Sequence, residues 1–351
     1  MDQIVLSRPE ERAPVSAASL ARRLGVSSAA VSYALNGRPG VSENLRRRIL
    51  DEARAAGVPV AVDAQERQGT LVFGLILADI SNPFYAELAT SVTDVGRARG
   101  IEVFLTSVRD HPESAEGAVK ALIHHNVDGV IITSLDADNA AVCRPLRAAG
   151  IPFVLVSRRL ANMEADFVGI NDYAAGRDIM AHVLADGHDR IAIIAGRRSS
   201  TASRQRLAGF LAQMRSGGVQ PRHEWIISGG LNEDNGARAT EYLLDLGDLP
   251  DAIVCGTDAI AFGVISTLAS RGVRVPEDVA VTGFDGLSAA RSPMLDLTTI
   301  VQPRQEMAVN ALRLLSLRQG GGGGAPQAIT CTHQLHVGTS CGRHQKGRTN
   351  E

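Results

Sequence analysis

The sequence has no apolar run long enough to span a membrane and no charged-then-apolar stretch of the kind that forms a secretory leader. Its four cysteines are too widely spaced for a CxxC redox pair or a metal knuckle. They are Cys143, Cys255, Cys331 and Cys341. The neighbouring pair His124–His125 also has no cysteine or carboxylate at metal-ligand spacing. These absences predict a cytoplasmic chain with four reduced thiols, no membrane association, and no resident metal or cofactor.

Sequence motifs for nucleotide chemistry are also absent. There is no G-x-x-x-x-G-K-[ST] loop and no G-x-G-x-x-G after a predicted strand. One G-x-S-x-G match occurs, at Gly338–Gly342, but a nucleophile elbow needs a following helix and downstream acid and histidine partners. Only nine residues follow, and His344 is the sole histidine among them. The sequence therefore favours a protein without catalysis, and a hydrolase is the remote alternative.

The segment from Ser16 to Ile49 has the spacing of a helix-turn-helix DNA reader. Ala21 lets a second helix cross close to the first, Gly25 supplies a positive-φ turn residue, and Val31 closes the small core beneath. Ser27 is placed to cap a second helix, Ser28–Leu35, which ends at Asn36-Gly37. A third helix is predicted to begin at Val41–Glu43, with Leu45, Ile49 and Ala53 on one face.

Charge and polar residues distinguish this segment from an ordinary three-helix bundle. Between Arg12 and Arg54 there are eight arginines against three acidic residues, a net charge of +5 in a chain whose formal charge is -2. Lysine occurs only at positions 120 and 346, so arginine is the general cation of the chain. Short polar side chains also cluster on or beside the second helix, where they suit phosphate contacts. Both features favour DNA binding.

From Leu71 onward, short apolar runs alternate with amphipathic stretches, the pattern of parallel sheets covered by helices on both faces. The first series of predicted strands is Leu71–Leu77, Ile101–Thr106, Gly129–Thr133, Phe153–Ser157 and Phe167–Ile170. The second series is Ile191–Ala195, Trp225–Ser228, Ala252–Cys255, Val279–Thr282 and Thr298–Val301. Two such α/β units predict two lobes, with a ligand cleft outside the carboxyl ends of the strands.

A run of five glycines, Gly320–Gly324, follows a predicted helix at Glu306–Leu317. Glycine repeats favour neither helix nor strand. We therefore expect this run to be a flexible connector at which the chain crosses back between the two lobes.

Four motifs in order resemble the LacI/GalR family of bacterial transcription repressors, over about Val15 to Gly342. They are Gly25–Gly37, Asp79–Phe84, Arg206–Phe210 and Val275–Asp285. The resemblance implies a small all-α helix-turn-helix domain followed by a two-lobed α/β core of two doubly wound parallel sheets, like a type I periplasmic binding protein. It also implies a homodimer that binds palindromic operator DNA, and a small effector in the core.

The resemblance assigns DNA contacts to six residues of the head. Ser27, Ser32 and Asn36 match the family's phosphate contacts, and Ser28, Ala29 and Tyr33 match the positions that face base edges. Tyr33 stands where many relatives have arginine, so the preferred base is open. The alternative is that Tyr33 packs against the head's own surface.

In the core, the resemblance places the effector against Asn82, Phe84, Tyr85, Arg206 and Asp285, with Arg206 and Asp285 facing each other across the cleft. Aromatic faces stack on rings, and arginine with aspartate offers donors and acceptors to hydroxyls. The alternative for Phe84 and Tyr85 is a place in the core.

Ser157 and Thr257 are also expected to contact the effector. These two positions and Leu231 depart from the usual sugar-binding pattern. Trp225 is expected in the core. A carbohydrate is the leading effector class, but these residues do not determine the class of the effector.

The resemblance also divides the chain. The head is 1–57, a hinge is 58–70, and the core is 71–342, with one lobe of 71–169 plus 302–326 and another of 170–301 plus 327–342. Residues 343–351 are expected to be a disordered tail without leucine heptads. The hinge is short, lacks leucine and carries Asp63 and Glu66. Either the hinge helix is abbreviated, with Val62 as a weak wedge for the minor groove, or the minor-groove contact is lost.

The sequence as a whole predicts a cytoplasmic, sequence-specific DNA-binding repressor that responds to a small effector. A periplasmic-type solute-binding protein without a DNA function is the main alternative, because it would share the two-lobed core.

Overall fold

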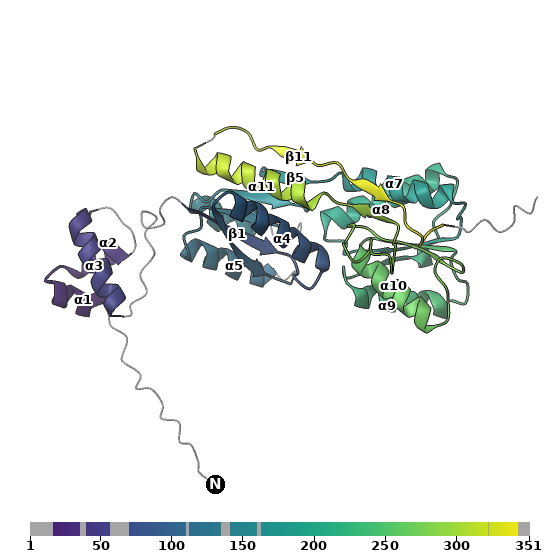
Figure 1. Cartoon of the computed structure of the whole chain (residues 1–351), viewed down its shortest axis with the longest axis horizontal. Helices are drawn as coiled ribbons and strands as arrows, with labels where there is room; N and C mark the ends of the chain where they lie inside the picture. Colours follow the sequence, from purple (N-terminus) through teal and green to yellow (C-terminus); the bar gives the residue numbers. More distant parts are fainter. Residues whose placement is uncertain are drawn as a thin grey trace, which may run out of the picture. The chain divides into compact units, whose positions relative to one another are not determined.

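The computed structural model describes residues 17–35, 40–56, 70–109, 112–134, 141–159, 163–321 and 323–342. The chain divides into two compact units, Met1–Thr70 and Leu71–Glu351. They are called the head and the core below (Figure 1). Among the described residues, the model contains no helix that combines the length and the apolar character needed to cross a membrane.

The described part of the head is three short helices around one small apolar core. The helices are α1 (Ala17–Leu24), α2 (Ser28–Leu35) and α3 (Glu43–Ala55). Gly25 has φ +67°, and the amide of the next residue, Val26, bonds back to the carbonyl of Ala21 at 3.0 Å. Leu20, Val31 and Ile49 are fully buried between the helices. The predicted alanine, glycine and valine thus have the roles that the helix-turn-helix spacing gave them.

The second helix has the bounds predicted from the sequence. Ser27 caps it, since its hydroxyl accepts the amide of Ala30 at 3.1 Å. Arg46 of α3 donates to the carbonyl of Ala34 at 3.4 Å and so ties α3 to the end of α2. The predicted helix stop at Asn36-Gly37, residues 58–69 of the hinge and the tail lie outside the described residues.

The first lobe of the core is a six-stranded parallel sheet in the order β11-β5-β4-β3-β1-β2. Its strands are β1 (Leu71–Leu77), β2 (Ile101–Ser107), β3 (Gly129–Ile132), β4 (Phe153–Val156), β5 (Asp166–Gly169) and β11 (Ala328–Thr330). Its helices are α4 (Pro83–Ala98), α5 (Pro112–His124), α6 (Arg144–Ala148) and α11 (Arg304–Gln319).

Alternation along β1 explains why both faces of this sheet are covered. Phe73, Leu75 and Leu77 belong to the apolar cluster on the side of α4 and α11. Val72 and Ile76 belong to the cluster on the side of α5 and α6. Successive strand residues point to opposite faces, so an uninterrupted apolar strand buries both.

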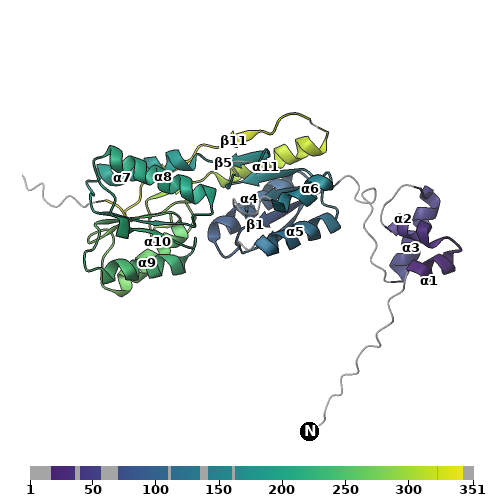
Figure 2. The same ribbon diagram turned by 180° about the vertical axis from the view of Figure 1, so that it is seen from behind.

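The second lobe holds a four-stranded parallel sheet, β7-β6-β8-β9, with α7 and α8 on one face and α9 and α10 on the other (Figures 1 and 2). Its strands are β6 (Ile191–Ala195), β7 (Ile226–Ser228), β8 (Ala252–Cys255) and β9 (Ala280–Thr282). Its helices are α7 (Asp172–Ala185), α8 (Thr201–Ser216), α9 (Glu233–Asp245) and α10 (Asp258–Ser270). An antiparallel pair, β10 (Thr299–Val301) and β12 (Gln334–His336), lies next to the end of β9. Single bridges link Thr282 to Thr298 and Asp285 to Val301.

The C-terminal crossing between the lobes lies later in the chain than the sequence predicts. Strand β11 pairs with β5 in the first lobe, so residues 328–330 do not belong to the second lobe. The glycine run therefore connects α11 to β11 within one lobe, and the crossing falls between β11 and β12. The reason for the error is that both strands are three residues long and partly exposed, which leaves no apolar pattern to read.

Two helix pairs in the second lobe pack backbone against backbone through glycine. A Cβ on Gly209 of α8 would lie 2.3 Å from the carbonyl oxygen of Tyr173 on α7, and one on Gly176 of α7 would lie 2.6 Å from the carbonyl oxygen of Arg206. Gly236 and Gly263 bring α9 and α10 together in the same way. Glycine at these positions is required by close approach rather than by its backbone angles.

We expect Gly209→Ala to lower the free energy of unfolding by about 2–3 kcal/mol, because the added methyl group must push α8 away from α7. Gly117→Ala is the matched control, since Gly117 lies in α5 and a Cβ there would have nothing within 4 Å. It should be neutral or stabilise by about 0.5–1 kcal/mol. Urea denaturation followed by circular dichroism measures both. Equal effects of the two substitutions would contradict the packing argument.

Candidate effector site

One cavity between the two lobes is lined by all seven predicted effector residues. They are Asn82, Phe84, Tyr85, Ser157, Arg206, Thr257 and Asp285. The cavity measures about 20 Å³, roughly the space of one water molecule. A larger crevice of about 480 Å³ adjoins it and shares Ser157 and Ala202 in its lining. The structure thus brings the predicted residues together in a nearly closed site.

The site lies where strands end and helices begin. Asn82, Ser200 and Thr257 follow β1, β6 and β8, and each caps the helix that comes next by accepting a backbone amide. Ser157 directly follows β4, and Asp285 follows β9 by three residues. Parallel strands with helical connections place such residues at one edge of each sheet, which is where α/β proteins bind ligands.

Arg206 is the centre of the polar network. Its Nε donates to Asp172 Oδ1 at 2.8 Å, and its Nη1 donates to the carbonyl of Gly256 at 2.8 Å and to Asp285 Oδ1 at 3.3 Å. Its guanidinium carbon also lies 3.8 Å from the centre of the Phe284 ring. With 5% of its surface exposed, Arg206 is held in one orientation by both charge and stacking.

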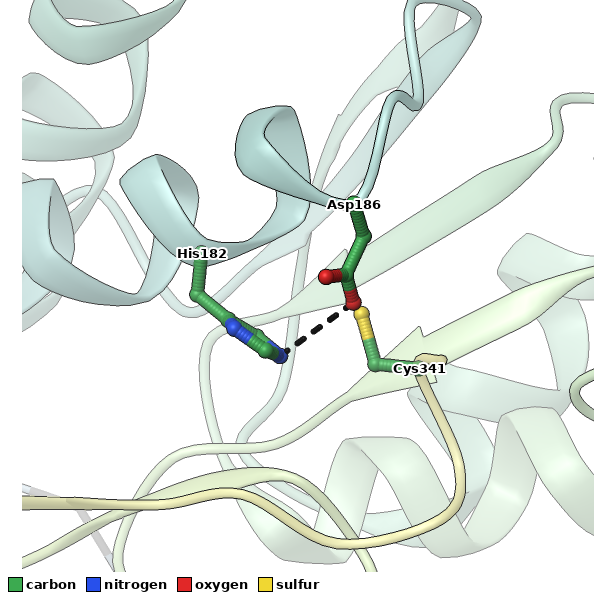
Figure 3. Close-up of side chains that lie close together, drawn as sticks. All are labelled: His182, Asp186 and Cys341. Carbon is green, nitrogen blue, oxygen red and sulfur yellow. Dashed lines mark ion pairs between the residues drawn. The ribbon is translucent and has the colours of Figure 1, made fainter. Parts of the chain in front are cut away.

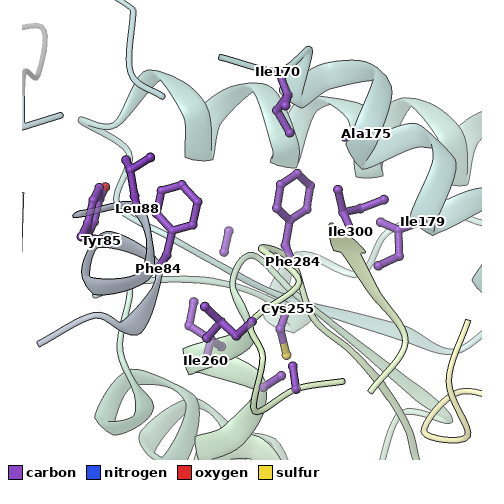
Figure 4. Close-up of a cluster of buried hydrophobic side chains, with 14 of the residues drawn as sticks. Phe84, Tyr85, Leu88, Ile170, Ala175, Ile179, Cys255, Ile260, Phe284 and Ile300 are labelled. Carbon is purple, nitrogen blue, oxygen red and sulfur yellow. The ribbon is translucent and has the colours of Figure 1, made fainter. Parts of the chain in front are cut away.

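Arg206 and Asp285 do not face each other across the cleft, which corrects the expectation from the sequence. Arg206 is on α8 and Asp285 follows β9, so both belong to the second lobe, where they form a buried ion pair. The groups that face them from the first lobe are the rings of Phe84 and Tyr85. Figure 4 shows this arrangement, with Phe84 and Tyr85 on α4 on one side and Phe284 on the other.

Burial raises the pKa of Asp285 to about 7; Arg206 opposes this shift, and the neighbouring Asp258 adds to it. Burial also raises the pKa of Asp258 to about 6, against hydrogen bonds from Thr299 and the Leu287 amide. For Arg206, burial disfavours the charge, but Asp172 and Asp285 outweigh it and raise the pKa. Asp258 and Asp285 therefore form a titrating pair close to neutrality beside a permanently charged arginine.

The backbone at two lining residues has a positive φ, namely Ser157 at 68° and Asp285 at 127°. Strain of this kind persists only where surrounding contacts hold it. Gln302 Nε2 donates to Asp285 Oδ1 at 2.7 Å, and Arg304 Nη1 donates to the Asp285 carbonyl at 2.7 Å. The orientation of Asp285 is thus fixed by residues at the start of the first lobe's last helix.

Besides the bonds from Arg304 to the second lobe, three further hydrogen bonds between described residues cross between the lobes near the cavity. Asn82 Nδ2 donates to the Leu231 carbonyl at 2.8 Å. The Ser288 amide donates to Glu87 Oε1 at 3.0 Å, and the Arg159 amide donates to the Thr201 hydroxyl at 3.2 Å. They hold the lobes together around the cavity, so a ligand larger than water requires the lobes to part.

Sequence reasoning missed Arg158, Ser200, Ala202 and Ser203, which also line the cavity. Arg158 is buried beside Tyr85, with 5.9 Å between its guanidinium carbon and the ring centre. The signal that could have found these residues is their place just after a predicted strand or at a predicted helix start.

Trp225, expected in a strand, instead ends a short 3₁₀ turn, His223–Trp225, before β7. It is buried in the core as predicted. Arg190 and Arg222 lie over its ring, with 5.7 Å and 4.2 Å from their guanidinium carbons to the ring centre. Trp225 therefore has a packing role away from the cavity.

The exposed face of α2 carries the predicted DNA-contacting side chains. Ser27, Ser28, Ala29 and Ser32 are exposed, while Val31 and Ala34 on the opposite face are buried. Tyr33 is 41% exposed, and its ring lies beside Gly40. Its position therefore combines contact with the head's own surface and exposure to solvent. Asn36 lies outside the described residues.

The serine of the G-x-S-x-G match is a structural residue. Ser340 is buried; its hydroxyl donates to the Val281 carbonyl at 2.7 Å and accepts the Thr298 amide at 2.9 Å. The Ser340 hydroxyl thus both donates to and accepts from backbone groups. This geometry gives no support to a nucleophile at Ser340.

Comparisons with known proteins agree with this architecture. Residues 70–312 match the family model of periplasmic binding proteins and the sugar binding domain of the LacI family. The chain is 30% identical over 298 residues to the HTH-type transcriptional repressor PurR of Actinobacillus pleuropneumoniae serotype 3 (strain JL03), covering 84% of this chain and 88% of that protein.

Two solved structures share the fold. The transcriptional regulator CelR in a cellobiose complex superposes with a TM-score of 0.71 at 27% identity, covering 93% of this chain and 99% of that one. The lac repressor dimer bound to operator and an anti-inducer superposes with a TM-score of 0.69 at 24% identity, covering 94% and 100%.

A two-lobed α/β core with an interlobe site, preceded by a helix-turn-helix head, defines a transcriptional regulator with an effector-binding domain. The chain belongs to the LacI/GalR family.

Proposed function

We propose that this regulator is a repressor, that it binds palindromic operator DNA as a homodimer, and that a small carbohydrate in the interlobe cavity modulates that binding. The observation that carries the effector part is that seven residues spread from Asn82 to Asp285 line one buried cavity. We also propose the division into head, hinge and core at residues 57 and 70, and action in the cytoplasm where the operator is. The protein has no catalytic step in this scheme.

The chemistry of the lining supports a polyhydroxylated ligand. Hydroxyls of Ser157, Ser203 and Thr257 both donate and accept hydrogen bonds. Arg206 and Asp285 add one charged donor and one charged acceptor, while the Phe84 ring offers an apolar face for the C–H side of a sugar. A ligand of this kind would replace the contacts that now hold the lobes together.

Coupling to DNA follows from lobe movement. The Asn82–Leu231 and Glu87–Ser288 bonds form only when the lobes are together. A ligand that binds one arrangement of the lobes more tightly shifts the equilibrium between them, by at most its difference in affinity. In a dimer this movement changes the spacing of the two heads, which is what operator DNA detects.

A thermal-shift screen of sugars and nucleosides, followed by DNA binding with a sequence selected from a random pool, tests the proposal. A sugar present at about 100 times its Kd should stabilise the core by about 2.7 kcal/mol and change the operator affinity of the full chain. Stabilisation by nucleosides alone would contradict the carbohydrate class. Absence of any preferred sequence in the selection would contradict the DNA-reading role.

A further inference from the structure

A cluster of metal-ligand side chains lies at the far end of α7 from the effector cavity. His182 and Asp186 are four residues apart, at the last turn and C-cap of that helix, and Cys341 comes from the segment after β12. His182 Nε2, a carboxylate oxygen of Asp186 and Cys341 Sγ all lie within 4.8 Å of one another. Figure 3 shows the three side chains converging from the helix and the C-terminal segment.

The cluster is distinct from the effector site. Asp172, which binds Arg206, begins α7, and Asp186 caps the other end. A helix of 14 residues is about 21 Å long, so the two sites are separated by the length of the helix. Of the described residues, these three make the one group of three or more His, Cys, Asp or Glu side chains with such convergence.

The surroundings hold these side chains in place. Cys341 is fully buried. Its carbonyl oxygen accepts a hydrogen bond from Nε2 of His188, which is also buried, at 3.1 Å. The side chains of His182 and Asp186 are 16% and 26% exposed, which leaves one side of the cluster open to solvent. His182 Nε2 is buried without a hydrogen bond and lies 3.5 Å from Asp186 Oδ2.

A buried ring nitrogen without a hydrogen bond calls for an explanation, because such groups are costly. Nitrogen, sulfur and carboxylate oxygen together are the donor set of zinc, whereas calcium and magnesium prefer oxygen alone. Zinc bonds of about 2.0–2.3 Å place tetrahedral ligand atoms roughly 3.3–3.6 Å apart. The His182–Asp186 distance of 3.5 Å already has this value. The sulfur of Cys341 lies within 4.8 Å of the other two ligand atoms, so it must move by about 1 Å at most.

We propose that His182, Asp186 and Cys341 form a three-ligand zinc site that fastens the C-terminal segment to α7. A Zn–S bond replaces the S–H bond of Cys341, and the thiol proton passes to solvent. Water from the open side completes the tetrahedron. The sequence alone does not associate these three residues, because Cys341 is far along the chain from His182 and Asp186.

Cobalt(II) in place of zinc tests the site in the untagged, reduced full-length protein. One equivalent of Co²⁺ should produce a thiolate-to-cobalt absorption band with tetrahedral visible bands, and one equivalent of Zn²⁺ should abolish them. Cys341→Ser should eliminate the thiolate band, while His182→Gln and Asp186→Asn should each weaken Co²⁺ binding at least tenfold.

Cys331→Ser is the matched control, since Cys331 is also a free, buried thiol but lies outside the cluster. It should keep the band unchanged. If Cys341→Ser fails to fold, the His182 and Asp186 variants decide the question on their own. Absence of a cobalt band in the parent protein, or binding as tight in all three cluster variants as in the parent, overturns the proposal.

Discussion

Arg206→Ala should lower the free energy of unfolding of the core by about 3–5 kcal/mol and weaken the response to effector at least tenfold. The reason is that the guanidinium is surrounded by Asp172, Asp285 and the Gly256 carbonyl, and its removal leaves buried acceptors without a partner. Operator affinity should persist where the core is still folded, since the head has its own separate core. Urea denaturation and calorimetry with the effector measure the two losses.

The loss of stability should also depend on pH. Burial already raises the pKa of Asp285 to about 7, and removal of Arg206 raises it further. The folded variant then holds a proton that the unfolded chain releases, so its deficit relative to the parent grows as the pH rises from 6 to 8. A deficit that shrinks over this range would contradict the charge assignment.

Arg215→Ala serves as the control, because Arg215 lies on the same helix but is exposed. It should change stability by less than about 0.5 kcal/mol. Arg206→Lys keeps the charge but not the planar fork that reaches three acceptors at once. We expect it to recover part of the stability and little of the effector response, which separates the two roles of Arg206.

The strands of the fold could be read from local patterns, except where they are short and exposed. Strands β1, β6 and β8 have the bounds expected from their apolar runs, because full burial leaves a continuous hydrophobic signal. Strands β11 and β12 have no such signal and were not foreseen. Their pairing depends on tertiary contacts. Because β11 pairs with β5 in the first lobe, the last crossing between the lobes lies later in the chain than the sequence predicts.

The membership of the candidate site could be predicted, but its internal arrangement could not. Position after a strand brings Asn82, Ser157 and Thr257 to the carboxyl-end edges of the two sheets, which face the cavity, whatever their neighbours are. The pairing of Arg206 with Asp172 depends instead on how α8 packs on α7 through two glycines, and its pairing with Asp285 depends on where the loop after β9 lies. A linear sequence does not show that contact, and hence an ion pair within one lobe was expected to span the cleft.

Tyr33→Ala should cost about 1–3 kcal/mol on a selected operator and far less on random DNA. The ring is 41% exposed on the face of α2 that carries Ser28 and Ala29, where it can reach base edges in the major groove. Fluorescence anisotropy on the two DNA types at several salt concentrations measures the difference. The salt dependence should stay the same, because a base contact releases no counterions.

Two variants locate the source of this effect. Tyr33→Phe keeps the ring and removes the hydroxyl, so an apolar contact with a thymine methyl group would survive it and a hydrogen bond would not. Arg47→Ala removes an exposed charge from α3, and it should weaken binding to both DNA types equally. It should also reduce the slope of log affinity against log salt concentration by about one.

Packing of Tyr33 beside Gly40 is the competing explanation. It predicts equal losses on both DNA types for Tyr33→Ala, together with a less stable head. That outcome would remove Tyr33 from the base-reading surface and leave Ser28 and Ala29 to carry it.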